Sequence, residues 1–357
     1  MKKEQPSAAA RRRNAVRARR LKQRRRKKIL RAVLLSLLIL AALAALGLLG
    51  FIIKDILFKE PVQAYSTADS FSGSLYSGTE GRAEPFAADL CVVSEDTLID
   101  SVNLEEDQEG LLLNLNDKEV LYSKGAYTKV YPASITKIMT ALLAFKYGNM
   151  EDTVTITEEN ITLEEGSQVI GFQTGDLVTM DELVHGLLVY SGNDAASAIA
   201  TRIGGSTAGF VDMMNSYAAE LGCTGTHFTN PHGLQDENHY TTPYDIYLML
   251  KEALKYPEFT EITQLGSYTI SYKRSWGEEV NTALLATDHY LTGEASAPKG
   301  ITVLGGKTGT TSDAGNCLAL LSQNAYGKPY VSIVMGASTK ELLYQQMSAL
   351  LENANME

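Results

Sequence analysis

The sequence predicts an α+β fold in which a mostly antiparallel sheet packs against helices. Three observations support this expectation for residues 87–357. Segments with strand character stand at both ends of the region, helical patterns occupy its middle, and the paired strands are joined by short turns. With 357 residues, 45% of them hydrophobic, the chain suffices for one large core or two modest ones. We therefore expect one domain or two closely packed lobes.

The expected elements are five strands and six helices, with strands before and after most of the helices. In chain order they are strands at 90–93, 110–115 and 119–124, a helix from 132, helices from 179 to 190, at 195–203, 210–221 and 243–254, strands at 317–322 and 330–336, and a helix at 340–351.

Local signals mark where these elements begin and end. The turn "NDK" between "GLLLNL" and "EVLYSK" predicts the first hairpin, and "AYGKP" predicts the last. Pro132 suits the first turn of a helix whose apolar residues recur at helical spacing. Thr179 and Glu182 have capping-box spacing, Thr242 precedes a proline that suits a helix start, and Gly222 closes the helix before it.

The charge of the chain is unevenly distributed. Residues 1–31 carry 15 of the 32 Lys and Arg and one acid, which leaves the rest with 17 basic and 41 acidic residues. Such an acidic body is not expected to bind nucleic acid through phosphates. Residues 32–53 then contain no charge over 22 positions, about 33 Å as a helix and enough to cross a bilayer.

We therefore predict a basic cytoplasmic arm at 1–31, a transmembrane helix at 32–53 and a flexible extracellular linker at 54–86. Positive charges before the span favour a cytoplasmic N-terminus, which would place the domain at 87–357 outside the cell membrane. A cleaved signal peptide is the alternative, with "VQA" at 62–64 as the candidate site. In both interpretations the acidic domain at 87–357 is exported from the cytoplasm.

Neither metal nor cofactor is predicted. The five histidines form no metal-binding motif. Cys91, Cys223 and Cys317 form no Cys-x-x-Cys pair and are expected to be structural. In an oxidising compartment this odd number leaves at least one cysteine unpaired within the chain.

The stretch "YPASITKIMT" at 131–140 contains the first candidate for chemistry. Ser134 and Lys137 stand three residues apart near a helix start, so they share one face and can touch. A lysine in a buried helix is costly unless it is paired or neutral. Alone the pattern is weak, because "SAPK" at 296–299 also matches it and a lysine at the rim of a core is simpler.

Two further motifs follow. "YSGNDAA" places Ser191 and Asn193 where one helix ends and the next begins, where both residue types commonly cap helices. "LGGKTGTT" contains Lys307 and Thr308 in a glycine-rich stretch. A P-loop would need a glycine at the position of Ile301, so nucleotide binding there is rejected.

In this order, Ser-x-x-Lys, Ser-x-Asn and Lys-Thr-Gly resemble the motif set of the penicillin-recognising serine enzymes. The flanking segments "YPASITKIMTALLA", "LLVYSGNDAASAIA" and "HFTNPHGL" resemble the D-alanyl-D-alanine carboxypeptidases, the low-molecular-weight penicillin-binding proteins. The similarity covers about residues 110–350. It implies the fold shared by penicillin-binding transpeptidases and β-lactamases, peptidoglycan stem peptides ending in D-Ala-D-Ala as substrates, and β-lactams as inhibitors.

The resemblance also implies the catalytic roles. Ser134 would be the nucleophile that forms an acyl-enzyme, and Lys137 its base, kept neutral by burial and by a second cation, Lys307. Ser191 would pass a proton towards the leaving amine. Asn193 would hold Lys137 and the substrate amide.

The third motif would bind the substrate. Lys307 and Thr308 would hold the terminal carboxylate, and Gly309 would allow close approach to the substrate backbone. Backbone N–H groups of Ser134 and Thr310 would form the oxyanion hole. Some members of the family have His at the position of Thr310, so substrate preference could differ. The second all-β domain and C-terminal amphipathic anchor of many members are not expected, since about 20 residues follow the last predicted strand.

Three other functions remain open. A transpeptidase or an endopeptidase acting on crosslinks uses the same motifs with another acceptor or substrate. A class A β-lactamase needs a glutamate that activates the deacylating water, and the expected position is His227, which counts against it. A catalytically silent cell-wall binding protein would not need the intact motifs.

Overall fold

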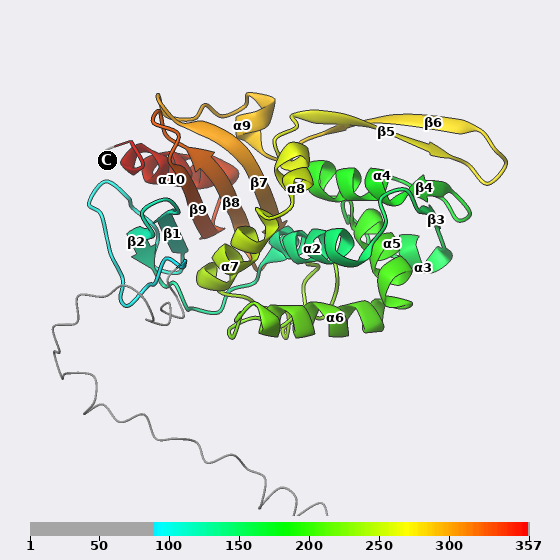
Figure 1. Cartoon of the computed structure of the whole chain (residues 1–357), viewed down its shortest axis with the longest axis horizontal. Helices are drawn as coiled ribbons and strands as arrows, with labels where there is room; N and C mark the ends of the chain where they lie inside the picture. The colour runs from blue at the N-terminus through cyan, green and yellow to red at the C-terminus, as the bar shows by residue number, and fades with distance from the viewer. Residues whose placement is uncertain (1–88, 356–357) are drawn as a thin grey trace, which may run out of the picture. The chain divides into compact units, whose positions relative to one another are not determined.

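The computed structural model describes residues 89–355 of the chain (Figure 1). The predicted basic arm (1–31), transmembrane helix (32–53) and linker (54–86) lie outside these residues. Across 89–355, no helix has both the length and the hydropathy needed to span a bilayer.

Two antiparallel sheets and a group of helices make up this region. The elements are β1 (Glu109–Asn114), β2 (Glu119–Lys124), η2 (Ala133–Thr136), α2 (Lys137–Tyr147), β3 (Thr153–Thr155), α3 (Glu158–Ile161), β4 (Leu177–Thr179), α4 (Met180–His185), η3 (Gly186–Tyr190), α5 (Asn193–Gly204), α6 (Thr207–Glu220), α7 (Pro243–Ala253), α8 (Pro257–Thr263), β5 (Ser267–Lys273), β6 (Glu279–Leu285), α9 (His289–Thr292), β7 (Thr302–Thr311), β8 (Gly315–Gln323), β9 (Pro329–Ala337) and α10 (Lys340–Asn353).

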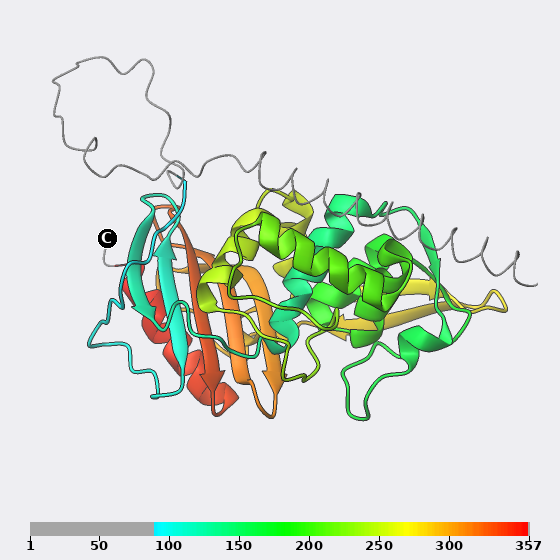
Figure 2. The ribbon, with the colours of Figure 1, turned by 90° about the horizontal axis from the view of Figure 1, so that it is seen from below.

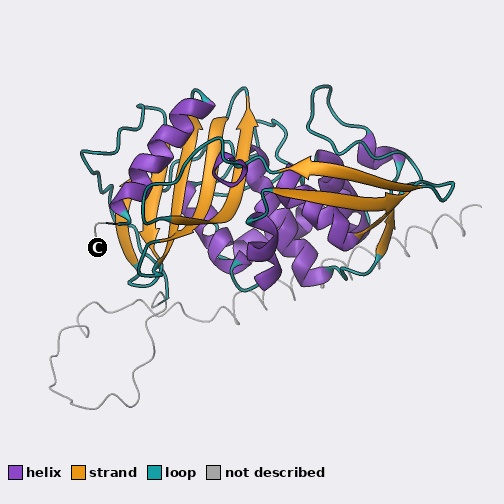
Figure 3. Cartoon of the chain, turned by 90° about the horizontal axis from the view of Figure 1, so that it is seen from above, coloured by secondary structure: helices purple, strands orange, loops and turns teal. Residues whose placement is uncertain are grey.

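The larger sheet has five strands in the order β2-β1-β9-β8-β7, so β7 is an edge strand. Successive side chains along its strands point to opposite faces and enter two different hydrophobic clusters, as expected for a sheet covered on both faces. Leu318 and Leu320 belong to the cluster that packs on α10, whereas Ala319 and Leu321 belong to the main core with α2 and α7. Figures 2 and 3 show α10 on one face of this sheet and the helical group on the other.

Helix α2 forms the centre of the helical group. Its residues from Lys137 to Ala144 are all buried, and it contacts α5, α6 and α7. The smaller sheet, in the order β3-β4-β5-β6, covers α4, and its long β5–β6 hairpin extends away from the larger sheet (Figure 1). Lys137, the first residue of α2, is therefore a charged residue type in a fully buried position, which is unusual.

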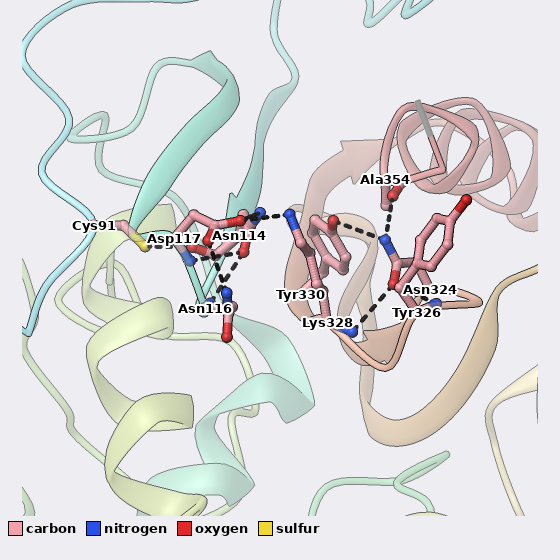
Figure 4. Close-up of polar contacts among 9 residues, drawn as sticks. All are labelled: Cys91, Asn114, Asn116, Asp117, Asn324, Tyr326, Lys328, Tyr330 and Ala354. Carbon is pink, nitrogen blue, oxygen red and sulfur yellow. Dashed lines mark hydrogen bonds and ion pairs between the residues drawn. The ribbon is translucent and has the colours of Figure 1, made fainter. Parts of the chain in front are cut away.

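Polar side chains tie together the two hairpin turns at one end of the larger sheet (Figure 4). Asn114 closes the β1–β2 turn by accepting the N–H groups of Asn116 and Asp117. Lys328, from the β8–β9 turn, donates to Asp117 at 2.7 Å. Asn324 donates to the carbonyl of Ala354 at 3.2 Å, which fixes the end of α10. These contacts join the β1–β2 turn to the β8–β9 turn and the β8–β9 turn to the end of α10.

The structure confirms both expected hairpins and the expected helices to within a few residues. The strand expected at 90–93 is wrong. Its backbone has no sheet neighbour, because Cys91 N–H donates to the Tyr247 hydroxyl and the Tyr244 hydroxyl donates to Cys91 O, both at 2.9 Å. All three cysteines are buried and free. The sequence analysis missed β3 to β6, the short helices α3, α8 and α9, and the full ten-residue length of β7.

Gly306 fixes the pairing of β7 with β8, and this gives the first prediction. Its φ is 154°, and a Cβ there would lie 2.1 Å from the backbone oxygen of Ala319. Gly306→Ala should therefore lower the free energy of unfolding by at least about 2 kcal/mol, measured by urea denaturation. Gly327→Ala is the matched control, because its φ is also positive (79°) but no atom lies within 4 Å of the added Cβ. Equal losses in both variants would contradict the role of the β8 contact.

Candidate active site

Ser134 lies in the tight turn η2, one residue after a strained position. Ala133 has φ +47°, a left-handed conformation that is costly for an L-residue, and its carbonyl accepts from the Thr136 hydroxyl at 2.8 Å. Gly233 packs against the same carbonyl, where a Cβ would lie only 1.8 Å from the oxygen. This turn therefore holds Ser134 in place before α2 begins at Lys137, rather than within the α-helix that the sequence predicted.

Lys137 has no solvent exposure, and its amine is surrounded by three oxygens. Nζ lies 2.9 Å from Ser134 Oγ, 2.7 Å from Asn193 Oδ1 and 2.8 Å from the backbone oxygen of His232. The last two oxygens are acceptors only. A neutral amine would donate its two hydrogens to them and direct its lone pair at the hydroxyl of Ser134. These contacts can therefore accommodate Lys137 either as a neutral amine or as an ammonium.

The surroundings of Lys137 favour the neutral form. Burial lowers its pKa well below the ordinary value, and the nearby charge of Lys307 lowers it further, against a smaller opposing effect of Asp194. The carboxylate of Asp194 is itself engaged, since it accepts the N–H groups of Ile170 and Gly171 at 3.0 and 2.9 Å. A desolvated lysine near a second cation is suited to accept a proton, because its neutral form is favoured.

Lys307 is the second buried lysine, and β7 carries it. It is 1% exposed, and Nζ donates to the carbonyl of Thr308 at 3.0 Å. Burial lowers its pKa to about 7, and Asp288 acts in the opposite direction. The hydroxyl of Thr308 forms a hydrogen bond with that of Thr287. Lys307, with a pKa of about 7, also lowers the pKa of Lys137.

The three motifs meet at one cleft between η2, the start of α5 and the outer edge of β7. Six of the eight predicted site residues line it, and the other two, Lys137 and Lys307, are buried beside them. The six are Ser134, Ser191, Asn193, Thr308, Gly309 and Thr310.

Gly309 brings the strand into contact with the serine turn. A Cβ at this position would lie 3.0 Å from the backbone nitrogen of Ser134 and 2.9 Å from the backbone oxygen of Pro132. Only glycine permits this approach without a shift of one element. The backbones of the first and third motifs are therefore in direct contact.

The second motif sits at a change of helix type. Ser191, with φ +69°, ends the π-helical turn η3, and α5 begins at Asn193. The N–H of Asn193 donates to the backbone oxygen of Gln168 at 2.8 Å, and the side chain of Gln168 donates to Tyr190 O. The loop around Gln168 thus fixes the start of α5, which aims the Asn193 side chain at Lys137.

Two buried histidines support the serine turn, and the sequence analysis gave them no role. The N–H of Thr229 donates to His239 Nδ1, so Nε2 carries the proton and donates to the Thr136 hydroxyl at 2.8 Å. That hydroxyl holds Ala133. Burial lowers the pKa of His239 to about 4 and that of His232 to about 3. The segment "HFTNPHGL" includes His232 but not His239, and no spacing rule reveals a contact made by a carbonyl such as that of His232.

Among residues 89–355 no group of three or more His, Cys, Asp or Glu side chains is placed to hold a metal ion.

Comparisons with known proteins agree with this geometry. The sequence profile described as D-alanyl-D-alanine carboxypeptidase matches residues 103–339, about two thirds of the chain. The chain belongs to this family. DacF of Bacillus subtilis, a D-alanyl-D-alanine carboxypeptidase, is 35% identical over 257 residues, which cover 70% of this chain and 62% of DacF. DacC of Escherichia coli is 32% identical over 68% of this chain and 59% of its own length. The chain thus spans about three fifths of these relatives.

Solved structures of similar proteins have the same fold. The Streptomyces DD-transpeptidase superposes with a TM-score of 0.64 at 27% identity, over 69% of this chain and 95% of that one. A D-alanyl-D-alanine carboxypeptidase from Mycobacterium tuberculosis gives 0.62 at 27% identity, over 71% and 92%. The predicted α+β fold with antiparallel sheets is therefore confirmed.

The buried histidines predict a pH dependence of stability. A group whose pKa falls on folding resists protonation in the folded state, so its contribution to stability is lost as pH falls below the unfolded value near 6.5. From pH 7 to 5, His239 alone should lower the free energy of unfolding by about 2 kcal/mol. Urea midpoints across this range measure the slope. His239→Gln should be less stable at pH 7 but show a shallower slope, and an unchanged slope in the variant would rule out His239 as a source.

Proposed function

We propose that this protein is a serine-type D-alanyl-D-alanine carboxypeptidase that removes the terminal D-alanine from peptidoglycan stem peptides. One observation carries the proposal: the fully buried Lys137 amine lies 2.9 Å from Ser134 Oγ with two carbonyl oxygens occupying its other hydrogens. Family membership and the names of the relatives support the substrate class.

In the proposed reaction, Lys137 accepts the hydroxyl proton while Ser134 Oγ attacks the carbonyl carbon of the penultimate D-alanine. The backbone N–H groups of Ser134 and Thr310 stabilise the oxyanion, and the contact of Gly309 with Ser134 keeps these two segments together. The C–N bond then breaks, and Ser191 passes a proton to the leaving amine. Water hydrolyses the acyl-enzyme and regenerates Ser134.

Lys307 and Thr308 would bind the free carboxylate of the terminal D-alanine. An ammonium and a hydroxyl at adjacent positions of an edge strand suit one small anion. β-Lactams also carry a carboxylate beside a reactive carbonyl, so they should acylate Ser134 and leave slowly. A transpeptidase would share these steps and differ in the acceptor, as the name of the Streptomyces enzyme illustrates.

We also propose that residues 32–53 anchor the protein in the cell membrane with the catalytic domain outside. The 22 uncharged residues that follow 15 basic ones support this topology. A reporter fused after residue 60 should be located outside the cytoplasm. A cytoplasmic location of the reporter would contradict the proposed orientation.

Lys137→Arg tests the base. Arginine keeps the positive charge but cannot accept a proton, because its pKa stays above 12. Acylation by fluorescent penicillin should fall at least about 100-fold, and Ser134→Ala should abolish labelling. Near wild-type acylation in Lys137→Arg would remove lysine from the mechanism, and labelling of Ser134→Ala would place the nucleophile elsewhere.

Lys307→Ala separates a carboxypeptidase from an endopeptidase. Loss of a partly desolvated, charge-assisted contact should reduce kcat/KM for a free D-alanyl-D-alanine end by about 10- to 150-fold, equivalent to about 1.5–3 kcal/mol. The same peptide with an amidated end never made this ion pair, so its turnover should change little. Because Lys307 also lowers the pKa of Lys137, both substrates are compared from pH 6 to 9. Equal losses at every pH would make the carboxylate assignment wrong.

A further inference from the structure

The connection between α3 and β4, residues 162–176, forms one wall of the active-site cleft, and we call it the cleft loop. Gly166, Ser167 and Gln168 line the cleft together with the three motifs. The loop contains no helix or strand, so its shape depends on contacts with other segments.

Asp194, the second residue of α5, binds this loop through backbone N–H groups. Its carboxylate is buried, and Oδ1 accepts the N–H groups of Ile170 and Ala195, both at 3.0 Å. Oδ2 accepts the N–H groups of Gly171 at 2.9 Å and Phe172 at 3.4 Å. Three consecutive N–H groups of the loop therefore converge on one carboxylate, and the fourth comes from α5 itself.

The backbone of the loop is shaped for this carboxylate. Gly171 has φ +94°, and a left-handed residue within a turn directs successive N–H groups to one side, which makes a concave binding site for an anion. The side chain of Ile170 fills the space left by two glycines. A Cβ would lie 2.3 Å from Ile170 Cδ1 at Gly186 and 2.9 Å from it at Gly192. The loop thus fits the second motif in shape and in charge.

We propose that Asp194 is a positioning residue of the active site: its carboxylate binds the cleft loop to the start of α5 and thereby fixes Ser191 and Asn193. Ser191 has φ +69°, a strained conformation that its neighbours must hold. Asn193 Oδ1 accepts from Lys137 Nζ at 2.7 Å, so a shift of α5 would displace one of the oxygens around that amine. The inference rests on the proposed function, in which this lysine is the base for acylation.

Asp194→Asn keeps the size of the side chain but replaces one acceptor oxygen with an amide donor, so two of the four N–H groups lose their partner. The rate constant for acylation by fluorescent penicillin should fall at least about tenfold. Exchange of the backbone amide hydrogens at 170–172 with deuterium should become at least about tenfold faster. A smaller loss of acylation, or a loss without faster exchange, would overturn the proposal.

The direction of the effect separates positioning from electrostatics. Asp194 raises the pKa of Lys137, whereas burial and Lys307 lower it. Loss of the Asp194 charge would by itself favour the neutral amine and leave acylation unchanged or faster. Positioning instead predicts slower acylation at every pH from about 6 to 9. An unchanged maximal rate, with the pH profile displaced to lower pH, would contradict the inference.

Asp245→Asn is the matched control. Asp245 is also a buried carboxylate in the first turn of a helix, α7, and it accepts the N–H of Gly225 at 2.9 Å and the hydroxyl of Thr226 at 2.7 Å. None of these three residues lines the cleft. The variant should lose stability but acylate within about twofold of wild type. A loss of acylation equal to that of Asp194→Asn would reduce the role of Asp194 to folding.

Gly171→Ala changes the loop side of the contact and tests the proposal even if Asp194→Asn folds poorly. Alanine is strained at φ +94° although no atom lies within 4 Å of its Cβ, so acylation should fall at least about threefold. Gly205→Ala, at the other end of α5, has φ +71° and the same open space, and it should acylate like wild type. Equal losses in the two glycine variants would contradict the proposal.

The same experiment distinguishes failure of this inference from failure of the proposed function. Fluorescent penicillin reports acylation without turnover of a peptide. If the wild-type protein is acylated but does not release D-alanine from a D-alanyl-D-alanine peptide, the carboxypeptidase proposal fails. The acylation rates of Asp194→Asn and Asp245→Asn relative to wild type then still decide the role of Asp194.

Discussion

The burial of a primary amine at the start of α2 is the constraint on which the site depends. Lys137 has no access to water, so its three polar contacts must come from the protein, and each comes from a different segment: Ser134 from η2, Asn193 from α5 and His232 from the long connection before α7. Displacement of any one of them would leave a buried polar group unsatisfied. The requirement for satisfied hydrogen bonds therefore aligns three parts of the chain, and the same burial lowers the pKa of the amine and favours its neutral form.

Strain and support are combined around this amine. The left-handed Ala133 would not persist in an isolated peptide, but the Thr136 hydroxyl and the close approach of Gly233 hold its carbonyl. His239 orients that hydroxyl from behind. On the other side of the cleft, Gly309 permits contact between backbones rather than side chains. Ser134, the proposed nucleophile, is thus held by contacts on both sides, which suits a reaction whose geometry must be set before the substrate arrives.

Most of the larger sheet and the longer helices could be predicted from the sequence because their signals are local. Hairpin turns, the Thr242 cap and apolar spacing each depend on a few neighbouring residues. Strands β3 and β4 have three residues each, too short for any period, whereas β5 does alternate in burial and could have been recognised. The site residues came from motif order. The contacts of the His232 carbonyl and the Thr287 hydroxyl escaped because they are tertiary contacts that no local pattern encodes.

The position of β7 at the edge of the larger sheet affects the tendency of the protein to self-associate. An open strand edge offers unpaired backbone groups on which another protein chain could add a strand and begin aggregation. Here the edge belongs to the glycine-rich strand "TVLGGKTGTT", whose pairing with β8 shifts register between Val303 and Gly305. Such a strand is a poor template for a long partner, because glycine weakens pairing and the bulge breaks its period. It remains open to a short peptide held by its end, so the feature that discourages self-association also leaves room for a small extended ligand.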